Sequence, residues 1–491
     1  MRPMMKPRLQ CAAWLLALVT MVAGCAVNPV TGRQDFVMMS ESAEATAGRN
    51  ADADVRKEYG VYDLPALQEY VTGVGQRLAQ HSHRAQLSFH FTVVDSPEIN
   101  AFALPGGYIY ITRGMMAFLN SEAELAAVLS HEIGHVTARH SVRQISLAQA
   151  AAIGATLGSL LVPALRNQGA QDLIDLLGNA WISGYGRDNE LEADRLGAEY
   201  LARAGYDPQA MVRVIGVLKN QELFDREVAQ QEGREPRRYH GLFDTHPDND
   251  TRLKEAVGAA DQYAVDAKDA RPEQGRRDFL QHIDGIVYGD SPQQGVVRGS
   301  QFFHAELGIA LKFPAEWRVQ NRPDKLLAIS PRRDALIEMH LIEANGASPA
   351  DALRRLLKPD VGSRIQATSI NGLPAAELSG SRQGRPTIAL AIDFHNRLFL
   401  LIGSAALPDV FERRHGEMSA ALRSFRAITD AQRKLAKPLR LHTRPARQGQ
   451  TYAQLAAQSP LGSYAEQYLR LMNSAYPAGE PIAGESVKVV E

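Results

Sequence analysis

The sequence predicts an α+β protein: a mainly helical domain with a small sheet, then an α+β domain, then a small terminal module. Three observations predict this class. At 491 residues the chain is too long for one ordinary domain. Residues 121–148 and 187–205 are typical of helices, the first with apolar side chains at helical spacing. Residues 87–96 alternate in the manner of a strand, and the composition becomes strand-like after about residue 297.

The overall composition is that of a globular protein, with 45% hydrophobic and 22% charged residues. The formal net charge is −1 and the isoelectric point is near 6.9. A chain without a basic excess has no bulk electrostatic attraction for nucleic acid, so we expect no nucleic-acid partner.

The first 24 residues have the order of a bacterial export signal. Three basic residues precede the apolar stretch 11–23, which is too short for a permanent membrane span, and "VAGC" ends it. This end resembles the lipobox of lipoproteins, which implies that Cys25 is lipidated and that the protein is anchored to the outer membrane on its periplasmic side. A plain secretory signal is the alternative. The only other cysteine, Cys11, leaves with the signal, so we expect no disulfide.

The elements that follow can be assigned in chain order. A strand over 87–96, an extended stretch, a Gly-Gly turn and a further strand precede a helix over 121–148, which begins with an S-x-x-E capping box of Ser121 and Glu124. Residues 147–165 are the most apolar stretch, and we expect a helical hairpin that covers the site, with a spanning helix as the alternative. The predicted domains are a signal peptide (1–24), a tether (25–45), a peptidase-type domain (46–262), an α+β accessory domain (297–430) and a terminal module (440–491).

The stretch "HEIGH" places two histidines and a carboxylate on one helix. His131 and His135 lie one turn apart, about 40° around the axis, and Glu132 lies beside them. Two imidazole nitrogens at this spacing suit Zn²⁺, and a catalytic zinc takes a third protein ligand and keeps one position open. His140 falls on a different face of a continuous helix, so we expect a structural role for it.

The third ligand is expected from the second long helix. Glu190 and Asp194 share one face at i, i+4 spacing, next to the small residues Ala193 and Gly197. We expect Glu190 to bind the metal and Asp194 to accept the Nδ1 proton of a ligand histidine, although Asp194 could instead be a surface residue. Glu192 points the other way and is not expected to contribute.

Three segments together carry a family resemblance. "LSHEIGHVTARH", "YGRDNELEADRLGAEYL" and "DTHPDNDTRL" resemble, in order and spacing, the zinc peptidases of family M48, and most of all their soluble periplasmic, BepA-like branch, related to HtpX. The resemblance covers residues 40–260. It implies a gluzincin-like zincin fold, one Zn²⁺ per chain held by His131, His135 and Glu190, and Glu132 as general base.

The resemblance also carries over two residues near the metal, His246 and Arg252. His246 has two open roles, a hydrogen-bond donor to the oxyanion or a fourth ligand that closes the resting site. The terminal module resembles a LysM module, which makes peptidoglycan a further candidate partner. The stretch "NAFALPGG" offers a strand edge beside which an extended polypeptide could add.

These observations favour a zinc endopeptidase of the cell envelope. Its expected role is quality control, and its expected substrates and partners are unfolded or misassembled envelope proteins. The main alternative is a zinc-occluded chaperone or binding protein in which cleavage is rare. A peptidoglycan-directed hydrolase is a third hypothesis and rests on the terminal module alone.

Overall fold

The structure is a computed structural model that describes residues 25–161, 186–231, 249–264, 275–322, 325–344 and 346–491. Its contacts divide the chain into two compact units. The first unit holds the residues up to 54 together with 61–286 and 441–491, and the second holds 55–60 and 287–440. The terminal segment, which the sequence analysis treated as a separate module, therefore groups with the helical part of the chain.

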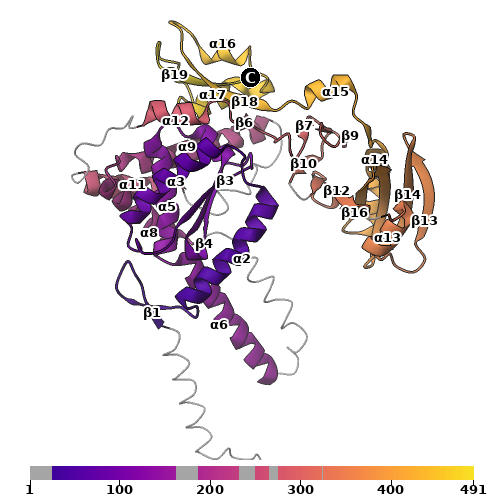
Figure 1. Ribbon diagram of the computed structural model, residues 1–491, viewed down its shortest axis with the longest axis horizontal. Coiled ribbons are helices and arrows are strands. Elements are labelled where there is room, and N and C mark those ends of the chain that lie inside the picture. Colours follow the sequence, from indigo (N-terminus) through magenta and orange to yellow (C-terminus); the bar gives the residue numbers. More distant parts are fainter. Residues whose placement is uncertain (1–24, 162–185, 232–248, 265–274, 323–324, 345) are drawn as a thin grey trace, which may run out of the picture. The chain divides into compact units, whose positions relative to one another are not determined.

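The first unit is mainly helical, as predicted (Figure 1). Before the second unit its elements are β1 (Cys25–Val27), β2 (Gln34–Phe36), α2 (Glu41–Tyr59), α3 (Pro65–Gln80), β3 (His90–Val94), β4 (Ala101–Leu104), β5 (Tyr108–Thr112), α4 (Arg113–Phe118), α5 (Glu122–Thr137), α6 (His140–Leu161), α8 (Arg187–Arg203), α9 (Gln209–Gln231), α11 (Asn249–Ala264) and α12 (Arg276–Ile283). The terminal segment adds β18 (Leu439–Pro445), α16 (Tyr452–Ala456), α17 (Ala465–Met472) and β19 (Ser486–Val490).

The small sheet of this unit has the strand order β3-β5-β4. The predicted Gly-Gly turn is confirmed, because Gly106 and Gly107 take positive φ angles of 76° and 90° between β4 and β5. The predicted half-buried character of β3 is wrong, since all its residues after His90 are buried. β3 pairs in parallel with β5. Parallel strands are typically covered on both faces, so the alternation of polar and apolar residues in β3 does not indicate one buried and one exposed face.

Helix α5 is the centre of the first unit. Every residue from Ala123 to Thr137 is buried, and α5 packs against α3, α8 and α9 as well as against β4. A helix that is enclosed on all sides holds its side chains in fixed positions, which is what a metal site requires.

The apolar stretch 147–165 is only partly described. Residues up to Leu161 continue α6, while 162–165 and the second arm of the predicted hairpin lie outside the described residues. Among the helices that the structure describes, none is long and apolar enough to span a membrane.

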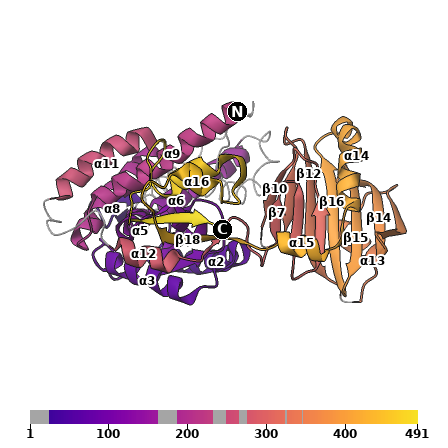
Figure 2. The ribbon, with the colours of Figure 1, turned by 90° about the horizontal axis from the view of Figure 1, so that it is seen from above.

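The second unit is built on a seven-stranded antiparallel sheet of order β10-β11-β12-β16-β15-β14-β13, seen strand beside strand in Figure 2. A smaller sheet of this unit has the strand order β17-β9-β8-β7. The elements are β6 (Val287–Tyr288), β7 (Val296–Arg298), β8 (Gln301–His304), β9 (Ile309–Lys312), β10 (Arg318–Asn321), β11 (Leu326–Ile329), β12 (Ala335–Glu343), α13 (Pro349–Leu357), β13 (Arg364–Ile370), β14 (Leu373–Arg382), β15 (Arg385–Phe394), β16 (Arg397–Ala405), α14 (Pro408–Arg423), β17 (Arg426–Ala427) and α15 (Asp430–Leu435).

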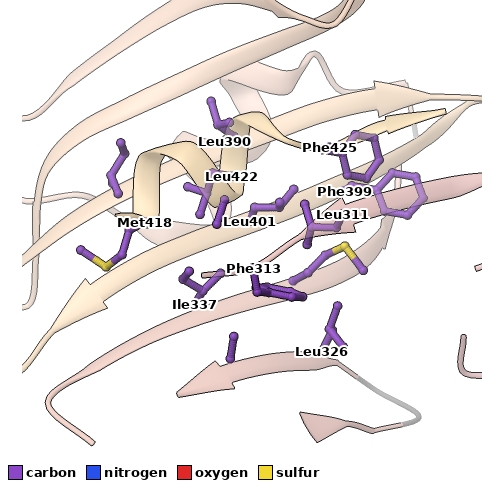
Figure 3. Close-up of a cluster of buried hydrophobic side chains, with 14 of the residues drawn as sticks. Leu311, Phe313, Leu326, Ile337, Leu390, Phe399, Leu401, Met418, Leu422 and Phe425 are labelled. Atoms are coloured by element: carbon purple, nitrogen blue, oxygen red, sulfur yellow. The ribbon is translucent and has the colours of Figure 1, made fainter. Parts of the chain in front are cut away.

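Helices cover both faces of the large sheet. Met418 and Leu422 of α14 pack over Leu401 and Phe399 in the larger core (Figure 3), and Leu353 and Leu357 of α13 pack on the opposite face. The predicted hairpin between β15 and β16 is confirmed: His395 and Asn396 take φ angles of 52° and 58°, as a two-residue type I′ turn requires.

Candidate metal centre

Helix α5 begins at a well-defined cap, about three turns before His131 and about four turns before His135. Ser121 accepts a hydrogen bond from the Glu124 amide at 3.2 Å, as predicted. The other half of the predicted capping box differs. The Glu124 carboxylate accepts a hydrogen bond from the backbone N–H of Asn120 at 2.7 Å, and not from the backbone N–H of Ser121. Both bonds satisfy amides that have no partner within the helix, and together they fix where the helix starts.

Close packing between α5 and α8 brings the third predicted ligand to the histidines. A Cβ atom added to Gly134 would lie 3.0 Å from the Ala193 carbonyl oxygen, and one added to Gly197 would lie 3.2 Å from the His131 amide nitrogen. The predicted role of the small residues is confirmed: larger side chains at these positions would push the two helices apart.

The three predicted ligands converge. The Nε2 atoms of His131 and His135 are 3.0 Å apart, and the Glu190 carboxylate oxygens lie 3.5 Å and 3.4 Å from them. Ligands about 2.0–2.1 Å from a tetrahedral zinc are separated by about 3.3 Å, so this donor set has the size and chemistry of a zinc site. All three residues are buried, and within the described part of the chain they form a group that could hold a metal ion.

Asp194 and Arg252 lie behind His131. Asp194 Oδ1 is 2.8 Å from His131 Nδ1, and Arg252 donates to both Asp194 oxygens, at 2.8 Å and 2.7 Å. Burial alone would raise the pKa of Asp194. The Arg252 guanidinium and His131 lower this pKa by more than burial raises it, so the pKa lies below its ordinary value. An ionised Asp194 holds the Nδ1 proton of His131, which leaves Nε2 as the metal-binding atom.

The helix that carries the histidines ends earlier than predicted. We expected one helix over 121–148, but α5 stops at Thr137 and α6 starts at His140. Between them Arg139 takes a φ of 56°, which is uncommon for a residue other than glycine. Its guanidinium binds the buried Glu44 carboxylate at 2.9 Å and 3.1 Å, and this ion pair holds the break in place.

The break changes the position of His140. On a continuous helix His140 would face away from the metal site, but its Nδ1 lies 2.9 Å from Nδ1 of His135. Its Nε2 lies 3.2 Å from Glu192 Oε2. The prediction that His140 lies on a different face from the metal site was therefore wrong, and so was the prediction that Glu192 points to the opposite side. The structural rather than catalytic role of His140 stays a prediction. The local sequence could not predict the contact between His140 and Glu192. The turn that allows this contact depends on Glu44, which lies 95 positions before Arg139 in the sequence.

The proton positions along this chain follow from the metal site. If His135 binds through Nε2, its Nδ1 carries a proton and donates to His140 Nδ1. His140 must then carry its own proton on Nε2, where it donates to Glu192. Burial lowers the pKa of His140, although Glu192 partly offsets this, and the hydrogen bond from His140 lowers the pKa of Glu192. A neutral His140 and an ionised Glu192 are the forms that this chain requires.

The comparison with known families agrees with this site. Residues 65–260 match the model of peptidase family M48, and this range contains both histidines and Glu190. Residues 65–260 are an M48 peptidase domain. Metallopeptidases of this family use zinc, in agreement with the donor set described above.

Similar proteins match part of this chain. A protein of Yersinia pestis named beta-barrel assembly-enhancing protease is 35% identical over 208 residues, which are 41% of this chain and 40% of that protein. The Escherichia coli K12 protein of the same name is 34% identical over 40% of each chain. The mitochondrial metalloendopeptidase OMA1 of Schizosaccharomyces pombe is 31% identical over 37% of this chain and 54% of that protein. The chain thus spans about two fifths of the length of its bacterial relatives.

Solved structures add little. A solution structure of cyanobacterial PsbP from Synechocystis has 14% identity and a TM-score of 0.22, and covers 28% of this chain and 98% of its own.

Of the remaining predicted site residues, Glu132 and Arg252 are buried near the ligands. Glu132 is buried next to the ligands on α5, with 1% of its surface exposed, and its charge helps to raise the pKa of Arg252. Arg252 lies on α11 and contacts Glu190 at 3.4 Å as well as Asp194. His246 lies outside the described residues. Cys25 is the first residue of β1.

Proposed function

We propose that this protein is a zinc-dependent endopeptidase of the bacterial cell envelope that cleaves misfolded or stalled outer-membrane proteins. The observation that carries the proposal is the convergence of His131, His135 and Glu190, with Glu132 buried beside them. A protein that only bound a metal would need the three ligands. It would not need Glu132, a further buried carboxylate on the helix that carries the two histidines.

The proposed reaction is the hydrolysis of a peptide bond. Bound zinc would supply a Lewis acid that lowers the pKa of water and polarises a carbonyl group. Glu132 accepts a proton from the attacking water on its carboxylate and then gives it to the leaving amine nitrogen. Asp194 holds the Nδ1 proton of His131, and the His140–Glu192 pair does the same for His135, so both rings keep their orientation.

His246 completes the proposed machinery. We assign it as a hydrogen-bond donor to the oxyanion that develops on the carbonyl oxygen. The alternative is a latch, in which its imidazole takes the fourth metal position until substrate displaces it. Pro247 restricts the backbone next to His246, which favours a residue held in place.

The proposed substrate is an extended or unfolded polypeptide. Among the described strands β4 pairs with β5 alone, so it lies at an edge of the small sheet, close to α5. A substrate backbone could add beside β4 as a further strand, and such pairing does not depend on sequence. The name of the two bacterial relatives, beta-barrel assembly-enhancing protease, agrees with outer-membrane proteins as the substrate class.

The proposed location is the periplasmic side of the outer membrane. The support is the order of basic residues, apolar stretch and "VAGC" that precedes Cys25. Cys25→Ala should release the protein into the soluble periplasmic fraction. A variant that stays in the membrane after a carbonate wash would instead identify residues 147–165 as a transmembrane helix.

Peptidoglycan binding is a second candidate function for the terminal segment. Its elements follow the order β18, α16, α17, β19, with β18 and β19 antiparallel, an arrangement that agrees with a LysM-like module. A cavity of about 250 Å³ is bounded by α16, β19 and the loop between α17 and β19, together with Arg276 of α12. Its lining includes Tyr452, Asn473, Glu480 and Ile482. Co-sedimentation of the protein with purified sacculi tests this function.

The experiment that tests the proposed activity uses unfolded casein. The purified protein should cleave casein over time, a chelator should stop the cleavage, and added zinc should restore it. Protection of casein from aggregation without cleavage, in the presence of zinc, would favour the chaperone alternative instead.

A further inference from the structure

The two faces of the hairpin formed by β1 and β2 carry different side chains. Cys25 pairs with Phe36, Ala26 with Asp35, and Val27 with Gln34. Directly opposed residues lie on the same face of an antiparallel pair, and alternate residues of a strand share a face. Positions 25, 27, 34 and 36 therefore lie on one face, and positions 26 and 35 lie on the other.

The face that carries Asp35 is turned toward the M48 domain. Asp35 Oδ2 lies 3.5 Å from Nε of Arg143 on α6 and accepts a hydrogen bond from the Asn28 amide at 2.8 Å. Just beyond β2, Val37 is buried, and the Met38 amide donates to the buried Ser146 hydroxyl of α6 at 3.0 Å. These contacts fix the hairpin against α6, so its other face points away from the domain.

The outward face carries exposed apolar side chains next to the exposed Gln34. Val27 is 58% exposed and Phe36 39%, and Met38, which continues the alternation of β2, is 43% exposed. Leu147, which follows Ser146 on α6, is 61% exposed. Single exposed apolar side chains are ordinary, but three of the thirteen large ones that the described residues expose, Val27, Phe36 and Met38, lie on this one short hairpin.

We propose that this face, formed by Val27, Phe36 and Met38, inserts into the headgroup region of a phospholipid bilayer. The inference rests on the lipid anchor proposed at Cys25. Cys25 pairs with Phe36 in the strand register, so an acyl chain attached to residue 25 would hold this hairpin, with its exposed apolar side chains, at the bilayer surface. Exposed Arg33 in the turn between the strands can reach the phosphate groups while its stem stays in the apolar layer.

The consequence is a fixed orientation of the M48 domain at the membrane. A lipid anchor alone is a flexible tether, whereas a second contact through a hairpin bonded to α6 limits rotation of the domain. The inserted face belongs to the domain that carries the metal site, so the site would be held at a defined position relative to the bilayer.

A site-specific fluorescent label tests the proposal. The full chain has two cysteines, of which Cys11 leaves with the signal and Cys25 is acylated, so Phe36→Cys introduces a single free thiol. The lipidated variant is labelled with an environment-sensitive dye and reconstituted in phosphatidylethanolamine–phosphatidylglycerol vesicles. Quenching is then measured with nitroxide-labelled lipid and with aqueous iodide. The matched control is Val257→Cys on α11, whose position is 42% exposed.

The proposal predicts that nitroxide lipid quenches the label at position 36 at least several-fold more than the label at position 257, and that iodide does the reverse. A label at position 36 that iodide quenches as strongly as the control would overturn it. The lipid anchor is judged separately, by the mass of the mature protein and by vesicle flotation. An acylated, floating protein with a water-exposed position 36 therefore refutes the hairpin contact while the anchor stands.

A second measurement does not depend on acylation. In the Cys25→Ala background the protein should still bind the same vesicles weakly, and Phe36→Ser with Met38→Ser should reduce its partition about tenfold, because two exposed apolar side chains leave the interface. Equal partition of the two proteins would contradict the proposal.

Discussion

Nδ1 of His140 lies 2.9 Å from Nδ1 of His135, although five residues separate them and a continuous helix would place them on different faces. The left-handed residue Arg139 between α5 and α6 makes this contact possible. The metal site therefore has two outer supports, Asp194 behind His131 and the pair of His140 and Glu192 behind His135.

The first prediction concerns this second support. His140→Ala should weaken zinc binding by about 10- to 100-fold, because His135 loses the acceptor that fixes its Nδ1 proton. Competition with a chromophoric chelator measures the affinity. Gln144→Ala, four residues further along α6, serves as the control for changes in that helix. An unchanged zinc affinity in His140→Ala would mean that the contact is only packing.

The second prediction separates the two roles of His246. Loss of an oxyanion donor in His246→Ala should lower kcat on casein by about 10²-fold, equivalent to roughly 3 kcal/mol, because such a donor stabilises only the transition state. A latch would have the opposite effect, since its removal opens the resting site. Basal cleavage above that of the wild type would thus exclude the donor role.

The third prediction concerns the attachment of the terminal segment. The buried amine of Lys488 on β19 donates to the carbonyl oxygens of Ala117 and Leu119, at 2.8 Å and 2.6 Å. Burial lowers the pKa of Lys488, and the nearby Glu124 carboxylate partly offsets this. Lys488→Ala should destabilise the docking of β19 by about 3 kcal/mol, because the buried groups that it bonds lose their partner.

Hydrogen exchange of the β19 amides measures this loss. Arg444→Ala is the control, because that residue is also a cation of the same small sheet but forms an exposed pair with Glu491. We expect the control to change exchange little. Equal protection of β19 in Lys488→Ala and in the wild type would contradict the assigned role.

The fourth prediction is a pH dependence of the second unit. His304 on β8 is buried, and its Nδ1 accepts a hydrogen bond from the Leu307 amide at 3.3 Å. Burial lowers its pKa below the ordinary value. As the pH falls below about 6.5, His304 therefore binds a proton in the unfolded chain but stays neutral in the folded protein. This difference lowers the stability of the folded state.

His304→Phe removes this proton difference. The Tm of the variant should fall less than that of the wild type between pH 7 and pH 5, as measured by calorimetry. If the Tm of the wild type and the Tm of the variant fell equally with pH, His304 would have the same pKa in the folded and the unfolded chain, which would contradict the prediction.

Much of the metal site could be predicted from sequence because its chemistry is local. His131 and His135 are one helical turn apart, and Glu190 and Asp194 are one turn apart on a second helix with small residues beside them. The Gly-Gly turn before β5 and the His395–Asn396 turn were equally clear, because their residues tolerate positive φ.

The rest depends on contacts between residues far apart in the chain. The end of α5 is set by Arg139 and Glu44, and the Glu124 carboxylate binds Asn120 instead of Ser121. Local propensity favours continuing a helix through Ala138 and Arg139, and it contains no information about a buried acid on α2. The positions of His140 and Glu192 were missed for the same reason.

The most direct test of the central claim is Glu132→Gln. The variant keeps all three ligands, so it should bind about one zinc per chain, as the wild type does, while cleavage of casein falls by about 10²- to 10⁴-fold because the general base is gone. Metal content and casein cleavage are measured on the same preparation, with Glu190→Gln as the ligand control. Full cleavage by Glu132→Gln, or zinc lost from Glu132→Gln but retained by Glu190→Gln, would contradict the account.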